Sequence, residues 1–555
     1  MPESNTDSVS EALPIELARR EVKRLSNGWF KHTLDFLEAE RDGLTLLQRI
    51  ECDLLGPSHL AIAAQTGAAK TTSAIEGTAW FVKEAERRGL PDRVLYVVRT
   101  LDLADEIAAK LRAHGLSVAV FHGRNQPDPQ QPNQSMCLNP GAVEAAIAQA
   151  YRVERAACKS DNRECALYRL CAYQQQKREL AHAKVVVCAH EWLFRRLPAE
   201  AGAFAATIIE ESFAATGLIT EYIKLADLKN DLVRWPVLRR GIPDHASTAR
   251  LRRLRQLLFD ALMLMRSEGC AVPNAMRQVG LTAEDCSRAA KLERRRAVAG
   301  LVEPGMSRSD SAAASVQKTA NRSIRLYVKL WEECARFEHT GRIQVSEKSV
   351  WLHQRRLLRR EIADRPILVL DATAQLEILQ HYLEFCEVKR ISVDAPNQRI
   401  HRYLGSFGKV ALFNPELTAR LRERVAQLSG GESAVTITHM DVEPAFDGLP
   451  NMATAHFNAM RGLNKWEQVR FAFVIGRPLP RDREMNRLVR CLTGEDLPFQ
   501  RLGWVCRSIP LKNGRHRTVQ ARGYSHPAFA AMQAELTDAE VIHAIGRARC
   551  QPHHR

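Results

Sequence analysis

The stretch from Ala63 to Thr72, AAQTGAAKTT, decides how the rest of the chain is interpreted. A loop of small residues lets backbone N–H groups close on phosphate oxygens, a lysine adds a positive charge, and a hydroxyl holds Mg²⁺. Gly67, Lys70 and Thr71 match these tasks. The apolar run LAIAA (60–64) predicts a buried strand before the loop, and SAIEGTAWFVKEA (73–85) predicts an amphipathic helix after it.

The loop departs from the common pattern G-x-x-x-x-G-K-[ST], because Ala64 and Ala69 stand where that pattern has glycines. The β-carbon of Ala69 either crowds the phosphates or is tolerated if its φ angle is negative. A plain turn that starts a helix is the alternative for this loop taken alone. Gln48, upstream, is either an adenine-reading side chain or an ordinary surface glutamine. The predicted nucleotide contacts are Gln48, Thr66, Gly67, Ala68, Ala69, Lys70, Thr71 and Thr72.

Length and composition indicate a multidomain globular protein. The chain has 555 residues, of which 45% are hydrophobic and 26% charged, and it has no apolar run long enough to span a bilayer. Its amino terminus is polar and lacks a signal core, so a cytoplasmic location without membrane association is expected. The 80 Lys and Arg against 64 Asp and Glu give a net charge of +16, which favours nucleic acid as a partner over simple solubility.

Strand and helix patterns alternate after the loop. RVLYVVRT (93–100) is an apolar run, LADEIAAKLRAHG (103–115) is amphipathic, and LSVAVF (116–121) is apolar again. Such alternation predicts an α/β fold with a parallel sheet, whose ligands bind at the carboxyl ends of the strands.

A cysteine-bearing segment follows between residues 122 and 182. Four thiolates suit an iron–sulfur cluster or a tetrahedral zinc ion. The intervening gaps of twenty, six and five residues weigh against zinc, whose structural sites carry short paired knuckles. Four unrelated buried thiols are the third interpretation. The candidate metal ligands are Cys137, Cys158, Cys165 and Cys171.

FAATIIEESF (204–213) is an apolar run that ends in two acids. Carboxylates at the end of a buried strand are what Mg²⁺ retention and water activation require, so we expect Glu210 to hold the ion through water and Glu211 to polarise the attacking water. A strand end that simply meets solvent is the alternative. The basic, helical stretch 217–364 predicts an inserted subdomain, and RPILVLDATA (365–374) predicts the start of a second α/β unit.

The order of these features resembles superfamily 2 helicases, in particular the XPD/DinG branch of iron–sulfur DNA helicases. By resemblance TGAAKT is motif I, VVRT motif Ia, IIEES motif II, LDATA motif III, MRGLN motif V and AIGRAR motif VI. The resemblance implies two RecA-like parallel-sheet domains. The predicted division is an N-terminal helical segment (1–45), a first domain (46–216) with the four-cysteine insertion (122–182), a helical arch-like insertion (217–364) and a second domain (365–555).

The resemblance further implies an ATP-dependent helicase or translocase on single-stranded or forked DNA, with ATP, Mg²⁺ and a [4Fe-4S] cluster, zinc being the alternative metal. The catalytic residues would be Lys70, Glu211, Arg547 and Arg549. Cys550 stands where the second motif VI arginine is expected, so Arg549 would substitute, and His543 replaces a glutamine. The chain ends soon after this motif, so either the elements that usually follow it are dispensable or this is a shortened copy. A regulatory protein that binds nucleic acid without turnover is the rival hypothesis.

Overall fold

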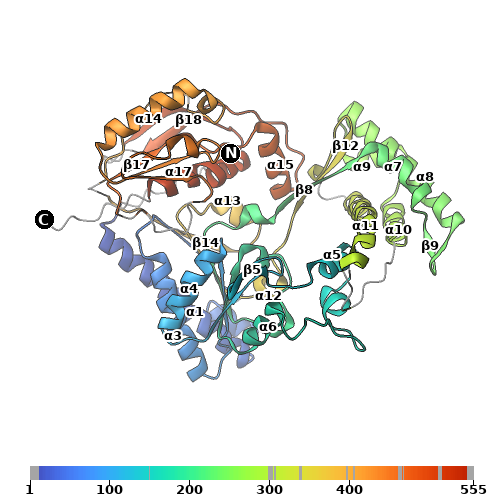
Figure 1. Cartoon of the computed structure of the whole chain (residues 1–555), viewed down its shortest axis with the longest axis horizontal. Helices are drawn as coiled ribbons and strands as arrows, with labels where there is room; N and C mark the ends of the chain where they lie inside the picture. Colours follow the sequence, from blue (N-terminus) through green and yellow to red (C-terminus); the bar gives the residue numbers. More distant parts are fainter. Residues whose placement is uncertain are drawn as a thin grey trace.

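The computed structural model describes residues 12–54, 56–148, 151–297, 304, 308–336, 340–395, 398–403, 405, 407–459, 466, 468–510 and 515–546. It contains a first α/β domain, a second α/β domain and an inserted helical part beside both (Figure 1). None of the described helices is long and apolar enough to cross a membrane.

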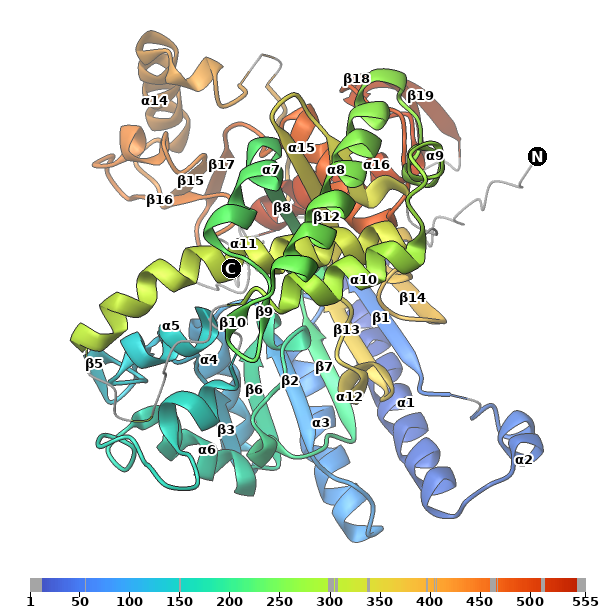
Figure 2. The same cartoon turned by 90° about the vertical axis from the view of Figure 1, so that its right-hand side faces the viewer.

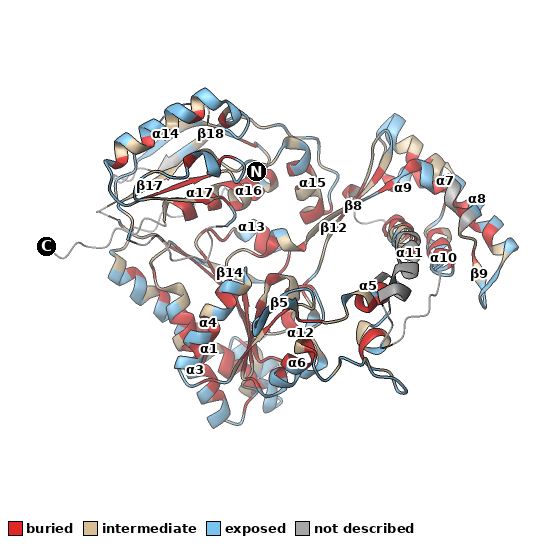
Figure 3. Cartoon of the chain, viewed as in Figure 1, coloured by how far each residue is buried: buried red, intermediate tan, exposed pale blue. Residues whose placement is uncertain are grey.

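A seven-stranded sheet forms the centre of the first domain. All its strand pairs are parallel, in the order β14-β1-β13-β7-β2-β6-β3. The five inner strands are buried on both faces, as parallel sheets require, while the helices around the sheet expose their outer sides (Figure 3). The strands are β1 (His59–Ala64), β2 (Val94–Val98), β3 (Val118–Phe121), β6 (Val185–Ala189), β7 (Ala206–Glu210), β13 (Ile367–Asp371) and β14 (Cys386–Ile391).

Helices cover both faces of this sheet. One face packs on α1 (Ile15–Arg41), α3 (Lys70–Arg87) and α4 (Leu101–Ala113). The other face is covered by α6 (Ala172–His182), α12 (Arg360–Ala363) and α13 (Leu376–Leu379), and by the short helix η2 (His190–Leu193). The sheet therefore lies between two helical layers, with the carboxyl ends of its strands at one edge.

The prediction that a second α/β unit begins at residue 365 is wrong. Strand β13 lies between β1 and β7, with Val369 opposite both Ala61 and Ile209, and β14 extends the same sheet beyond β1. An apolar run predicts a strand but not the sheet that receives it, because strand pairing depends on residues far away in the sequence. The first domain therefore resumes after the insertion and includes the stretch 365–391.

The second domain has a smaller parallel sheet in the order β16-β15-β17, an antiparallel hairpin, and several helices. Its elements are α14 (Pro415–Ser429), β15 (Ala434–Thr438), β16 (Met452–His456), β17 (Phe471–Val474), α15 (Asp482–Thr493), β18 (Gly503–Pro510), β19 (His516–Gly523), α16 (Pro527–Gln533), the π-helical turn η8 (Ala534–Asp538) and α17 (Ala539–Ile545). The predicted α/β class, with parallel sheets and inserted segments, is confirmed.

The helical insertion leaves and re-enters the first domain on an antiparallel ribbon. Strands β8 (Leu218–Lys224) and β12 (Ser349–Arg355) pair along their lengths, and β11 (Ile343–Val345) adds a third strand. The segment between them carries the short pair β9 (Leu238–Arg239) and β10 (Ile242–Pro243) and the helices α7 (Leu225–Arg234), α8 (His245–Glu268), α9 (Val272–Gln278), α10 (Ala283–Arg294) and α11 (Arg308–Ala335).

The ribbon also contacts the second domain through α15. The Cys491 thiol lies 3.4 Å from the Thr220 hydroxyl and donates to the Ile219 carbonyl at 3.2 Å. The guanidinium of Arg487 stacks on the Trp351 ring at 3.8 Å from its centroid. The root of the insertion is therefore packed against both domains.

The four-cysteine segment packs on the insertion from the other side. It contains the small pair β4 (Pro127–Asp128) and β5 (Gln131–Ser135), then α5 (Pro140–Ala148) and the π-helical turn η1 (Glu154–Cys158). Helix α5 lies against α11, where Arg325 Nη1 donates to the Ile147 carbonyl at 3.0 Å.

Candidate functional site

The loop that we expect to bind phosphate lies between β1 and α3, so the predicted order of strand, loop and helix is confirmed. Gly67 has a φ of 94°, and Ala69, directly before Lys70, has φ 59° and ψ 29°. The condition that φ of Ala69 be negative is therefore not met. A left-handed alanine costs about 1–3 kcal/mol, and such strain gathers at functional sites. The Lys70 ammonium donates to the Ala64 and Gln65 carbonyls at the end of β1, so its charge stays inside the loop.

Glu210 ends β7 beside this loop. Its carboxylate is buried and accepts from the Tyr96 hydroxyl at 2.6 Å, and it also hydrogen-bonds the Thr71 side chain. Burial raises the pKa of Glu210 to about 6, although the hydrogen bonds from Tyr96 and Thr71 act in the opposite direction. His190 Nε2 lies 2.8 Å from the Glu210 carbonyl oxygen, which fixes the strand end. Thr71 and Glu210, which were each predicted to serve Mg²⁺, therefore contact each other.

Glu211 follows in a left-handed conformation, with φ 64°. Its backbone N–H donates to Leu370 on β13 at 2.8 Å, so the turn is held by the neighbouring strand. The side-chain atom Oε2 is buried and has no hydrogen-bond partner among the described residues. A buried carboxylate oxygen with open accepting capacity can orient and polarise a water molecule.

The donors at this edge fit Mg²⁺. Thr71 offers a hydroxyl and Glu210 a carboxylate within hydrogen-bond reach of each other. Mg²⁺ bound with a nucleotide ordinarily takes one or two protein oxygens, phosphate oxygens and several waters, so a cage of three acidic side chains is not required. These two residues would hold the ion, which would neutralise charge on the phosphates when bound.

The second domain reaches the loop through α17. A β-carbon built on Gly546 would lie 2.9 Å from Thr66 Oγ1, so the backbone after α17 packs directly on the loop. His543 Nε2 lies 3.7 Å from Asp371 Oδ1, and Asp371 also accepts from the Thr373 N–H at 3.2 Å. The predicted Arg547 and Arg549, together with Cys550 and the RGLN stretch, lie outside the described residues.

A cavity of about 240 Å³ lies beside this contact and is lined by both domains. Arg99, after β2, pairs with Glu540 of α17 at 3.6 Å, and Glu540 Oε2 accepts from the Asn458 N–H at 2.8 Å. Sequence reasoning missed Arg99, Glu540, Tyr96 and Asp371 as members of this region. Arg99 and Asp371 lie at strand ends, Tyr96 lies within β2, and Glu540 lies on α17, so they share no single sequence signal.

The other predicted loop residues lie in or beside the loop. Ala68 is buried and its N–H donates to the Gln65 carbonyl at 3.3 Å, Thr66 is half-buried beneath α17, and Thr72 is exposed on the first turn of α3. Helix α1 also contacts the loop, because Arg19 Nε donates to the Gly67 carbonyl at 3.2 Å. The sequence did not indicate this contact.

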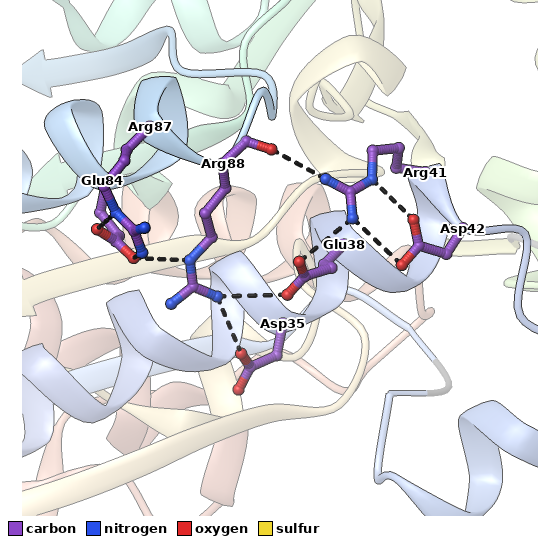
Figure 4. Close-up of polar contacts among 7 residues, drawn as sticks. All are labelled: Asp35, Glu38, Arg41, Asp42, Glu84, Arg87 and Arg88. Atoms are coloured by element: carbon purple, nitrogen blue, oxygen red, sulfur yellow. Dashed lines mark hydrogen bonds and ion pairs between the residues drawn. The ribbon is translucent and has the colours of Figure 1, made fainter.

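Gln48 does not lie at the loop, so the adenine-reading interpretation is wrong. Helix α1 starts beside Gly67 and ends at Arg41, about 40 Å further on for 27 helical residues. There Arg41 and Glu38 meet Arg88, at the far end of α3 (Figure 4). Helix α2 (Leu46–Glu51) follows at this far end, and the exposed Gln48 side chain serves as its capping box with Thr45.

The four cysteines are only partly gathered. Cys137 and Cys171 share a hydrogen bond, while Cys158 Sγ accepts from Arg124 Nη1 at 3.2 Å. Among the described residues, no three Cys, His, Asp or Glu side chains are grouped so that they could hold a metal ion. This arrangement does not fit a four-thiolate site, and no step is assigned to a cluster or to zinc. Iron–sulfur binding stays a prediction, which metal analysis after anaerobic purification tests.

Comparison with known proteins adds little to this description. No protein-family model matches the chain. No curated protein matches it either. Among solved structures, the chain is similar to one described as S. tokodaii Xpd4, with 11% identity, a TM-score of 0.36 and coverage of 92% of each chain. At this level of similarity, the functional argument rests on the geometry of the site alone.

Proposed function

We propose that this protein is an ATP-driven motor on nucleic acid, a helicase or translocase of the XPD/DinG type that acts on single-stranded DNA. One observation carries the proposal: the end of α17 in the second domain packs on the loop that holds Lys70, at the edge where β7 ends in Glu210 and Glu211 follows it. A nucleotide placed between two domains can couple its hydrolysis to their relative movement.

Each residue has a task in hydrolysis. Lys70 would contact the β- and γ-phosphates, Thr71 and Glu210 would hold Mg²⁺, and Glu211 would orient the attacking water. Two observations support the role of Glu211. Its backbone is strained, as is common at functional sites, and its buried Oε2 has no hydrogen-bond partner among the described residues. We propose that Arg547 and Arg549 supply positive charge for the transition state.

The choice of nucleic acid rests on charge. The excess of +16 suits a polyanionic track, and affinity for it should fall steeply with salt concentration. A cytoplasmic location is part of the same proposal.

An ATPase assay with and without single-stranded DNA tests the proposal. We expect hydrolysis that needs Mg²⁺, rises with DNA, and is lost in Lys70→Ala. Lys83→Ala is a suitable control, because this lysine lies on the same helix and contacts only the His114 carbonyl among the described residues. Hydrolysis absent from the parent, or unchanged in Lys70→Ala, would instead support the regulatory protein without turnover.

A further inference from the structure

The hairpin of β18 and β19 carries an exposed aromatic ring on one face. Trp504 is 67% exposed, and the guanidinium of its cross-strand partner Arg522 lies 5.7 Å from the ring centroid. An exposed indole ring beside a guanidinium offers a free face on which a planar ligand can stack. The hairpin lies at the outer margin of the second domain (Figure 2).

The two faces of the hairpin differ in exposure. Trp504, Cys506 and Ser508 alternate along β18 and are exposed, as are their partners Arg522, Gln520 and Thr518 on β19. The opposite face, which carries Val505, Arg507, Val519 and Ala521, is half-buried. One side of the ribbon thus packs on the domain, while the other presents a ring surrounded by polar and cationic groups.

The charge of the hairpin is of one sign. Between residues 503 and 523 the sequence has no Asp or Glu, and its positive residues are Arg507, Lys512, Arg515, Arg517 and Arg522. A surface of one sign attracts a polyanion and repels cationic partners. An apolar protein partner would instead require a larger uncharged patch around the tryptophan.

The base of the hairpin is joined to the helix that reaches the nucleotide loop. Asp538 ends the turn before α17 and lies 3.8 Å from Arg507, and Gln533 Nε2 donates to the Arg522 carbonyl at 3.3 Å. Asp538 also pairs with Arg477, which follows β17, at 2.5 Å. A ligand on the hairpin therefore acts on a surface that is mechanically connected to the segment carrying His543.

We propose that the exposed face of the β18–β19 hairpin binds single-stranded nucleic acid, with a base stacked on Trp504 and a neighbouring phosphate contacted by Arg522. Stacking needs an unpaired base with a free ring face, which favours single strands over duplex. This inference rests on the proposed function, for which it names one nucleic-acid contact outside the nucleotide site.

Direct binding without ATP tests the inference. In the full-length protein at fixed salt, Trp504→Ala should weaken binding of a fluorescent oligo-dT about fivefold or more, whereas Trp504→Phe retains a stacking ring and most of the affinity. Arg522→Ala should weaken binding and lower the salt slope by about one, because one phosphate contact is lost. Trp80→Ala is the matched control, since Trp80 is 44% exposed on α3.

The outcomes separate the two proposals. If the parent binds oligo-dT and both Trp504→Ala and Arg522→Ala bind as tightly, the hairpin inference fails while the proposed function stands. An equal loss of affinity for blunt duplex overturns the assignment to single strands. If the parent binds no oligonucleotide at low salt, the nucleic-acid part of the proposed function fails together with the inference.

Discussion

His543 of the second domain lies 3.7 Å from the carboxylate of Asp371, which ends strand β13 of the first domain. Both side chains are buried, so this contact joins the domains next to the loop that carries Lys70. Asp371→Ala should lower the maximal ATPase rate about tenfold by loosening this closure, which corresponds to roughly 1.4 kcal/mol. Measurement of the steady-state rate of ATP hydrolysis at saturating ATP tests this prediction. His456→Ala, which removes a hydrogen bond to Glu443 within the second domain, should leave the rate unchanged.

Ala69→Gly should stabilise the folded protein by up to about 1 kcal/mol, because glycine adopts the left-handed conformation without strain. Denaturant unfolding measures this change, and nucleotide affinity should not fall. Ala68→Gly is the neighbouring control: Ala68 has no positive φ angle, so glycine there should destabilise the protein. Equal destabilisation by both substitutions would contradict the strain argument.

Glu210→Gln should change how stability depends on pH. Burial raises the pKa of Glu210 from 4.5 to about 6, so the folded state binds more protons than the unfolded state between these values. The parent therefore loses about 2 kcal/mol relative to the glutamine variant as pH rises from 4.5 to 6. Unfolding without Mg²⁺ at several pH values measures this, and a constant difference between the two proteins would refute it.

Glu211→Gln should lower ATP turnover by about 100-fold or more while nucleotide binding is retained, because an amide cannot accept the proton of the attacking water. Single-turnover hydrolysis and a separate nucleotide-binding titration distinguish the two effects. Glu191→Gln is a control near the cavity, where Glu191 pairs with Arg356 at 2.8 Å and not with the loop. Equal turnover by parent and Glu211→Gln would assign the water to another group.

The sequence predicted local features well and long-range relationships poorly. Lys70, Thr71 and Glu210 were predicted to lie together because the carboxyl ends of parallel strands meet at one edge. The membership of β13 in the first sheet, and hence Asp371 in the site, depended on pairing across more than 150 residues with β7. Tyr96 gave no chemical signal of its own, because a tyrosine in an apolar run is also an ordinary core residue. The prediction that Gln48 reads adenine was wrong because α1 begins beside the loop and ends far from it, and Gln48 follows that far end.

The ribbon of β8 and β12 has a mechanical consequence. It emerges from the first domain, yet α15 of the second domain contacts it through the side chains of Cys491 and Arg487. Rotation of the second domain must therefore either break these contacts with α15 or tilt the ribbon. Helices α8 to α11 extend far beyond these contacts (Figure 1). A small tilt of the ribbon at the base of the insertion therefore displaces the distant ends of these helices by a larger distance.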